Sequence, residues 1–157
     1  MLLILLEYLE IDGIMAIQLI FCLETNKRAD TDGIYIRETI NEYFIVNNQT
    51  KLNKVYMNSK TKYKSKDVLK EIEKKKKEFK IGQTIVIYCV DTDDFERDYN
   101  HARELQDICK FCKDHEYELV WFCHDIEDVF LGHKVSDSEK VKEAKAFRQK
   151  KIIAEVN

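Results

Sequence analysis

Four short apolar runs, separated by longer segments of helical periodicity, constrain the fold of this chain most strongly. The runs cover residues 17–23, 52–57, 84–90 and 118–122. They are rich in β-branched and aromatic residues, which is typical of buried strands. Parallel strands need long crossover connections, and these are usually helical. The alternation therefore predicts an α/β fold with about four mostly parallel strands flanked by helices.

The segments between and after these runs predict the helices. Apolar residues recur there at the three- and four-residue spacing of an amphipathic helix. Ser65 stands where an N-cap is expected, because its side chain can accept a hydrogen bond from a backbone N–H of the first turn. The expected helices cover residues 34–44, 65–79, 98–115, 126–131 and 137–154.

The length of 157 residues and the composition favour one folded domain. Apolar residues make up 45% of the chain and charged residues 35%, which excludes general disorder. Met15 opens a stretch that leads straight into the first strand. We therefore interpret residues 1–14 as an N-terminal extension or an extra helix, and residues 15–157 as a single domain. The apolar start is too short and too acidic for a membrane span, so no membrane anchor is expected.

The cysteines indicate a reducing compartment. The chain has five of them, an odd number, and no signal peptide is recognisable, so we expect free thiols and a cytoplasmic location. Cys109 and Cys112 form a CxxC on one face of a predicted helix. Core packing is the preferred interpretation, because zinc would need a second pair of ligands.

Charge is distributed unevenly, although the net charge is only −3 at pH 7. Residues 60–80 and 140–151 are basic, whereas residues 91–128 are acidic. An acidic centre with basic flanks is the layout expected of a protein that holds the phosphate backbone of DNA or RNA. The alternative interpretation of the lysines from 74 to 77 is that they form the solvated end of a helix. The candidate nucleic-acid-binding residues are Lys64, Lys66, Lys74, Lys75, Lys76 and Lys77.

Acidic residues follow the first and third predicted strands. Glu24 comes directly after the first, and the third runs into Asp91, Asp93 and Asp94. Ligands of open α/β sheets bind beyond the carboxyl ends of the strands, so these acids should meet if the two strands are neighbours. If the strand geometry continues, alternation aims Asp91 and Asp93 the same way. Such carboxylates suit Mg²⁺ or Mn²⁺, and the alternative is that the later acids cap the helix beginning near Asp98.

Three strings of residues give the chain a resemblance to a known family. The first strand ends in Cys22 and Glu24 before a helix with Tyr35, and the third ends in the string Asp91 to Phe95. After the fourth strand, Ile126-Glu127 is followed by His133. In order and placement these strings resemble the Toprim family of topoisomerases, primases and OLD-type nucleases, and most closely its RloB-like branch, associated with bacterial defence loci.

The resemblance implies a single Toprim/Rossmann-like domain that hydrolyses phosphodiesters with Mg²⁺ or Mn²⁺. It implies catalytic roles for Glu24 and Glu127, and metal binding by Asp91, Asp93 and Asp94. The implied substrate is DNA or RNA, the implied setting is phage defence, and the implied protein partner is an ATPase. Two departures bear on activity: Thr25 replaces the usual Gly, and residues 122–125 read FCHD where the family tends to show Ser-Asn-Pro.

Three other functions fit parts of the pattern. A receiver-like signalling domain also has an Asp after its third strand, but it needs an acidic pair after the first. A haloacid-dehalogenase phosphatase carries its DxD at the first strand, whereas here the motif comes late. A non-catalytic Toprim-fold partner of an ATPase is the third alternative. His124 is a candidate proton carrier, with a core or capping role as its alternative.

Overall fold

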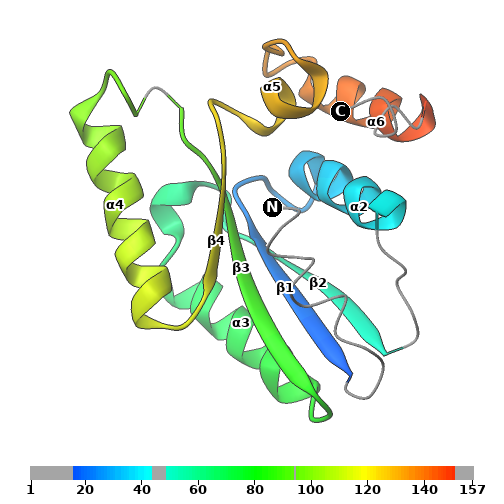
Figure 1. Ribbon diagram of the computed structural model, residues 1–157, viewed down its shortest axis with the longest axis vertical. Coiled ribbons are helices and arrows are strands. Elements are labelled where there is room, and N and C mark those ends of the chain that lie inside the picture. The colour runs from blue at the N-terminus through cyan, green and yellow to red at the C-terminus, as the bar shows by residue number, and fades with distance from the viewer. Residues whose placement is uncertain (1–15, 44–48, 94, 151–157) are drawn as a thin grey trace.

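A parallel sheet forms the centre of the molecule in the computed structural model, which describes residues 16–43, 49–93 and 95–150 (Figure 1). Within these ranges the sheet has four strands in the order β2-β1-β3-β4. The predicted α/β class is therefore confirmed, and so is the adjacency of the first and third strands. The strands are β1 (Ile17–Leu23), β2 (Thr50–Tyr56), β3 (Gln83–Asp91) and β4 (Glu118–Phe122).

The helices follow the expected order with small changes at their ends. The helix predicted to begin at residue 34 begins at Thr31, directly after Asp30, whose φ is 48°. The short helix at 126–131 has the predicted bounds. None of the helices in the described ranges is both long and apolar enough to span a bilayer. The elements are α2 (Thr31–Tyr43), the 3-10 helix η1 (Lys60–Lys62), α3 (Lys66–Glu78), α4 (Tyr99–Asp114), α5 (Ile126–Leu131) and α6 (Lys140–Lys150).

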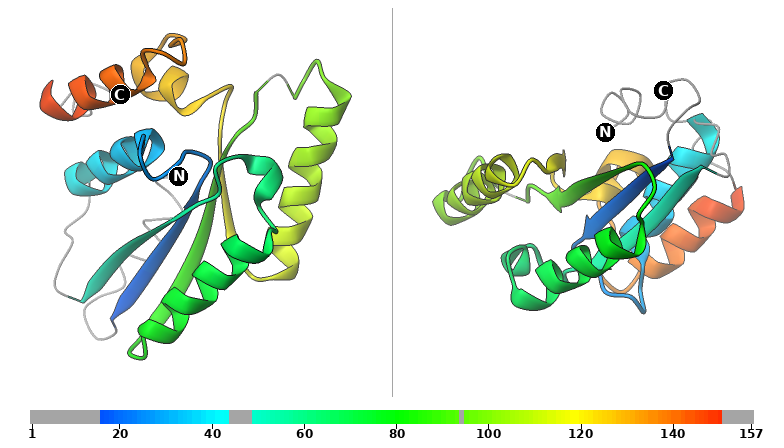
Figure 2. Two further views of the ribbon diagram at one scale, coloured as in Figure 1. Left: turned by 180° about the vertical axis from the view of Figure 1, so that it is seen from behind. Right: turned by 90° about the horizontal axis from the view of Figure 1, so that it is seen from below.

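Both faces of the sheet are covered, which accounts for the uninterrupted apolar sequence of β1. Leu19, Phe21 and Leu23 point to the face covered by α2, α5 and α6. Ile20 and Cys22 belong to the core cluster on the opposite face. The helices η1, α3 and α4 lie on that face (Figure 2). Because β1 lies between β2 and β3, every residue of this strand is buried.

An aromatic cluster attaches α6 to α2. Phe147 of α6 is 1% exposed, and its ring centroid lies 4.8 Å from that of Tyr35. Phe130 of α5 stacks on Tyr35 with 5.3 Å between the ring centroids, and it also contacts Phe147 at 5.7 Å. This packing fixes the start of α6, with Lys140, beside α5 at the carboxyl ends of the strands.

Ser65 caps α3 as predicted, since its hydroxyl accepts a hydrogen bond from the N–H of Val68 at 3.4 Å. Ser65→Ala is expected to lower the free energy of unfolding by about 1 kcal/mol, because that N–H loses its partner. Urea denaturation measures the change. Ser65→Asn is the matched control and should retain most of the stability, since Asn caps about as well as Ser. Equal stability of the Ala and wild-type proteins would contradict a role for the cap.

Candidate functional site

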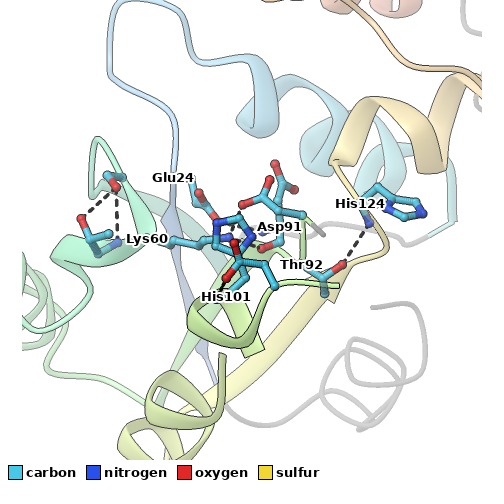
Figure 3. Close-up of polar contacts among 10 residues, drawn as sticks. Glu24, Lys60, Asp91, Thr92, His101 and His124 are labelled. Atoms are coloured by element: carbon cyan, nitrogen blue, oxygen red, sulfur yellow. Dashed lines mark hydrogen bonds and ion pairs between the residues drawn. The ribbon is translucent and has the colours of Figure 1, made fainter. Parts of the chain in front are cut away.

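Glu24 and Asp91 meet where β1 and β3 end. The paired register of these strands ends at Leu23 and Cys89. Beyond it, Oε1 of Glu24 accepts a hydrogen bond from the backbone N–H of Asp91 at 2.7 Å (Figure 3). The Glu24 side chain thus satisfies a backbone donor that the sheet leaves open. The two predicted site residues are brought together as neighbours across the edge of the sheet.

Both carboxyl groups hold protons more strongly than usual. Burial raises the pKa of Glu24 to about 7, while the Asp91 N–H and the charge of Lys60 oppose the rise. Burial also raises the pKa of Asp91 to about 9, and the negative charges of Glu24 and Asp32 add to the rise. Two carboxyls perturbed in this way at one sheet edge are typical of a functional site, since a scaffold gains nothing from their mutual repulsion.

Asp93 departs from the expected geometry. Its φ is 48°, and its backbone N–H donates to the carbonyl of His124 at 2.9 Å, so the strand has ended and the chain has turned. Strand alternation would aim Asp91 and Asp93 in one direction only if the strand continued through Asp93, and the structure shows that it does not. The Asp93 carboxylate instead pairs with the ammonium group of Lys60. Asp94, the third predicted metal ligand, lies outside the described residues.

Lys60 is a member of the site that sequence reasoning missed. It begins η1 just beyond β2, and Ser59 caps this short helix by accepting from the N–H of Thr61. Only 9% of Lys60 is exposed, and its Nζ donates to the carbonyl oxygen of Asp91 at 3.0 Å (Figure 3). Its position after a strand, at the same edge as Glu24, is the signal that could have identified it.

Asp32 is a second site residue that was not predicted. It lies in the first turn of α2, and its carboxylate accepts from the N–H of Thr25 at 3.1 Å and from the hydroxyl of Thr31 at 3.0 Å. Burial raises its pKa despite these hydrogen bonds. The donor at Thr25 is its backbone N–H, and the charge of Asp32 in turn acts on Glu24 and Asp91.

Glu127 reaches the same region from α5. It is 1% exposed, and burial raises its pKa. Lys140 at the start of α6 lies with its Nζ 3.2 Å from Oε2 of Glu127 and 3.9 Å from Oδ2 of Asp125. Neither Glu127 oxygen accepts a well-formed hydrogen bond from the described part of the chain, and the buried hydroxyl of Tyr35 also has no such partner there. The Tyr35 hydroxyl is therefore a donor left available at the site, whereas Glu127 is held by its ion pair with Lys140.

The predicted lysines divide into two groups. Lys64 and Lys66 are exposed beside η1, near the carboxyl ends of the strands. The lysine run from 74 to 77 lies roughly 12 to 16 Å beyond Lys66 along α3, taking the rise of an α-helix. The carbonyl of Lys75 accepts from Gln18, which is at the amino end of β1. The run therefore lies at the opposite end of the sheet from Glu24 and Asp91.

Within the lysine run, the side chains differ in their surroundings. Lys75 pairs with Glu71, and Lys76 pairs with Glu73 and donates to the hydroxyl of Tyr117. The remaining two, Lys74 and Lys77, are exposed to solvent.

Among the residues that the structure describes, the contacts of Glu24 and Asp91 do not include His124, His133 or the two cysteines of the CxxC. The imidazole of His124 is directed away from Glu24 and Asp91 in Figure 3, while its backbone N–H donates to Oγ1 of Thr92 at 3.0 Å. His133 is exposed, just beyond the end of α5. Cys112 is buried in the core beneath α4, whereas Cys109 is exposed, and both are free thiols. The structure agrees with core packing for Cys112.

The side chains at this edge of the sheet carry the kind of ligand atoms that a hard divalent cation prefers. The side chains of Glu24, Asp91 and Asp93 all offer carboxylate oxygens, the ligands that Mg²⁺ and Mn²⁺ prefer. In the described residues, however, no three Asp, Glu, His or Cys side chains are grouped closely enough to hold an ion as they stand. Asp93 is held by Lys60 instead. The ligand chemistry of these residues therefore fits the metal, but their side chains would have to move closer together to bind one ion.

Comparisons with family models, curated proteins and solved structures found no match for this chain. The Toprim-like character of the chain therefore stays a prediction from its residues.

Proposed function

We propose that this protein is a metal-dependent phosphodiester hydrolase of the Toprim kind. The observation that carries the proposal is the contact of Glu24 with the backbone of Asp91, which places two partly buried carboxyls with raised pKa values at the carboxyl ends of neighbouring parallel strands. Open α/β sheets bind their ligands at this place. A bound Mg²⁺ or Mn²⁺ would supply Lewis-acid stabilisation of the transferring phosphoryl group.

The proposal assigns a different role to each acidic residue of the site. Asp91 and Asp93 hold the metal. Glu24, with a pKa of about 7, takes or returns a proton at the attacking water near neutral pH, where a general base is most effective. Glu127 is a further acid at the same edge, paired with Lys140. DNA or RNA is the proposed substrate. The resemblance to the Toprim family also leads us to propose an ATPase partner, a cytoplasmic location and a role in phage defence.

A nuclease panel on the purified protein tests this function. Single- and double-stranded DNA and RNA are incubated with Mg²⁺, with Mn²⁺ and with a chelator. We expect metal-dependent cleavage that Asp91→Asn abolishes and that Asp107→Asn, an exposed acid on α4, leaves unchanged. A protein that cleaves none of these substrates with either metal would contradict the proposal and favour the non-catalytic partner of an ATPase.

The exposed lysines give a separate prediction about affinity. Changing Lys64, Lys66, Lys74 and Lys77 to Gln should weaken nucleic-acid binding and flatten its dependence on salt, by about 0.7 to 0.9 in logarithmic slope for each phosphate that the protein no longer neutralises. Binding is measured by fluorescence anisotropy in a chelator over a range of salt concentrations. The matched control changes Lys110 and Lys113, which are exposed on α4. If the salt dependence of binding were unchanged, the four lysines would be solvated surface residues that do not contact the nucleic acid.

A further inference from the structure

Lys60 is a buried cation that crosses the site. It starts beyond β2, yet its Nζ reaches the turn after β3, where it contacts the Asp91 carbonyl and the Asp93 carboxylate. These two strands flank β1, so their ends lie roughly 10 Å apart at the usual strand spacing. The side chain must therefore pass the end of β1, where Glu24 stands, and the charge of Lys60 acts on Glu24 as well.

A buried ammonium group is unfavourable unless anions surround it. Here the anion in contact with Lys60 is Asp93, one of the proposed metal ligands. Lys60 holds the carboxylate of this residue, and the turn at Asp93 is fixed through the His124 carbonyl. The nitrogen of Lys60 thus contacts the Asp93 carboxylate and the Asp91 carbonyl, and its charge acts on the nearby Glu24.

We propose that Lys60 and a divalent metal ion compete for the Asp93 carboxylate. Lys60 neutralises the metal-free site and leaves Asp93 when Mg²⁺ or Mn²⁺ binds. This inference rests on the proposed function, because it takes this carboxylate to be a metal ligand. It goes beyond that function by assigning to Lys60 a positioning role that sets how readily the site is loaded. Lys140 does not take this role, because it pairs with Glu127 and Asp125.

Metal affinity tests the competition without any need for activity. The dissociation constant for Mn²⁺ is measured on the full chain by the loss of the free-ion EPR signal. Lys60→Met should bind Mn²⁺ about tenfold more tightly than the wild type, since no internal cation has to be displaced. Lys62→Met is the matched control, because Lys62 is an exposed lysine of the same short helix, and its affinity should not change.

The possible results separate the inference from the proposed function. Equal or weaker binding by Lys60→Met, with normal binding by the wild type, would overturn the inference and leave the proposed function standing. Binding by Lys60→Met alone would support the inference, because the internal cation then excludes the metal. Absence of binding in both proteins would overturn the inference together with the proposed metal site.

Wild-type protein provides a second measurement that holds even if Lys60→Met does not fold. An amine-reactive ester labels exposed lysines, and mass spectrometry measures the label at Lys60 with and without Mn²⁺. Metal should increase the labelling of Lys60, because its Nζ is released from Asp93. Lys54, paired with Asp30 away from the site, is the internal reference. Lys60 labelling that stays constant or decreases at saturating Mn²⁺ would overturn the proposed displacement.

Discussion

Asp91→Asn is expected to remove the stabilisation that divalent metal gives the wild-type protein. A cation that binds only the folded site adds RT ln(1 + [L]/Kd), or about 2.7 kcal/mol at a hundredfold excess over Kd. For a chain of this length the gain corresponds to about 5 to 10 °C in melting temperature. Asp93→Asn should behave like Asp91→Asn, because both carboxylates are proposed ligands. Thermal melts with millimolar Mg²⁺ or Mn²⁺, and with a chelator, measure the effect.

The same melts contain a second, opposite effect of Asp91→Asn. Without metal, the variant should be more stable than the wild type at pH 8, since the unfavourable burial of an acid beside Glu24 and Asp32 is removed. The control Asp107→Asn should show neither change, because Asp107 is exposed on α4. A wild-type melting temperature indifferent to both metals would rule out the site as a metal centre and favour a non-catalytic scaffold.

In a chelator, the wild-type protein should become less stable as the pH rises from about 5 to about 8. Glu24 has a pKa of about 7 when folded against an ordinary 4.5, and Asp91 about 9 against 3.8. Between these values the folded state binds more protons than the unfolded state, so stability is lost with rising pH. For Glu24 alone, the rise from 4.5 to about 7 corresponds to roughly 3 kcal/mol over the window.

Urea denaturation at a series of pH values measures this slope. Glu24→Gln should flatten it, because the Gln side chain can still accept from the Asp91 N–H but does not titrate. Glu42→Gln, at an exposed position of α2, should keep the wild-type slope. If the difference between wild type and Glu24→Gln were independent of pH, the burial of a protonated Glu24 would be contradicted.

Local sequence was enough to predict the sheet and the edge at which the acids gather. β1 and β3 are continuous apolar runs because both lie inside the sheet, and the acid after each one marks its carboxyl end. The same rule applied to β2 would have included Lys60, which follows that strand. Its burial is what the sequence does not reveal, because a lysine after a strand is usually exposed.

Other features of the site depend on contacts between distant segments. The turn at Asp93 is fixed by a hydrogen bond to the His124 carbonyl, which comes from the loop after β4. The sequence around Asp93 therefore does not show that the strand stops before this residue. Lys140 reaches Glu127 because Phe147 packs against Tyr35, a contact between elements about a hundred residues apart. No pattern within α6 itself marks its first residue as part of a site.

The most direct test of the proposed hydrolase is the single-turnover cleavage rate of wild type and Glu24→Gln, measured on a fluorescent oligonucleotide with saturating Mn²⁺. The protein is predicted to cleave only with metal, and Glu24→Gln should be slower by about a hundredfold or more, the scale of a lost general base. Glu42→Gln should cleave at the wild-type rate. Equal rates for wild type and Glu24→Gln, or the same slow hydrolysis with and without protein, would contradict the proposed mechanism.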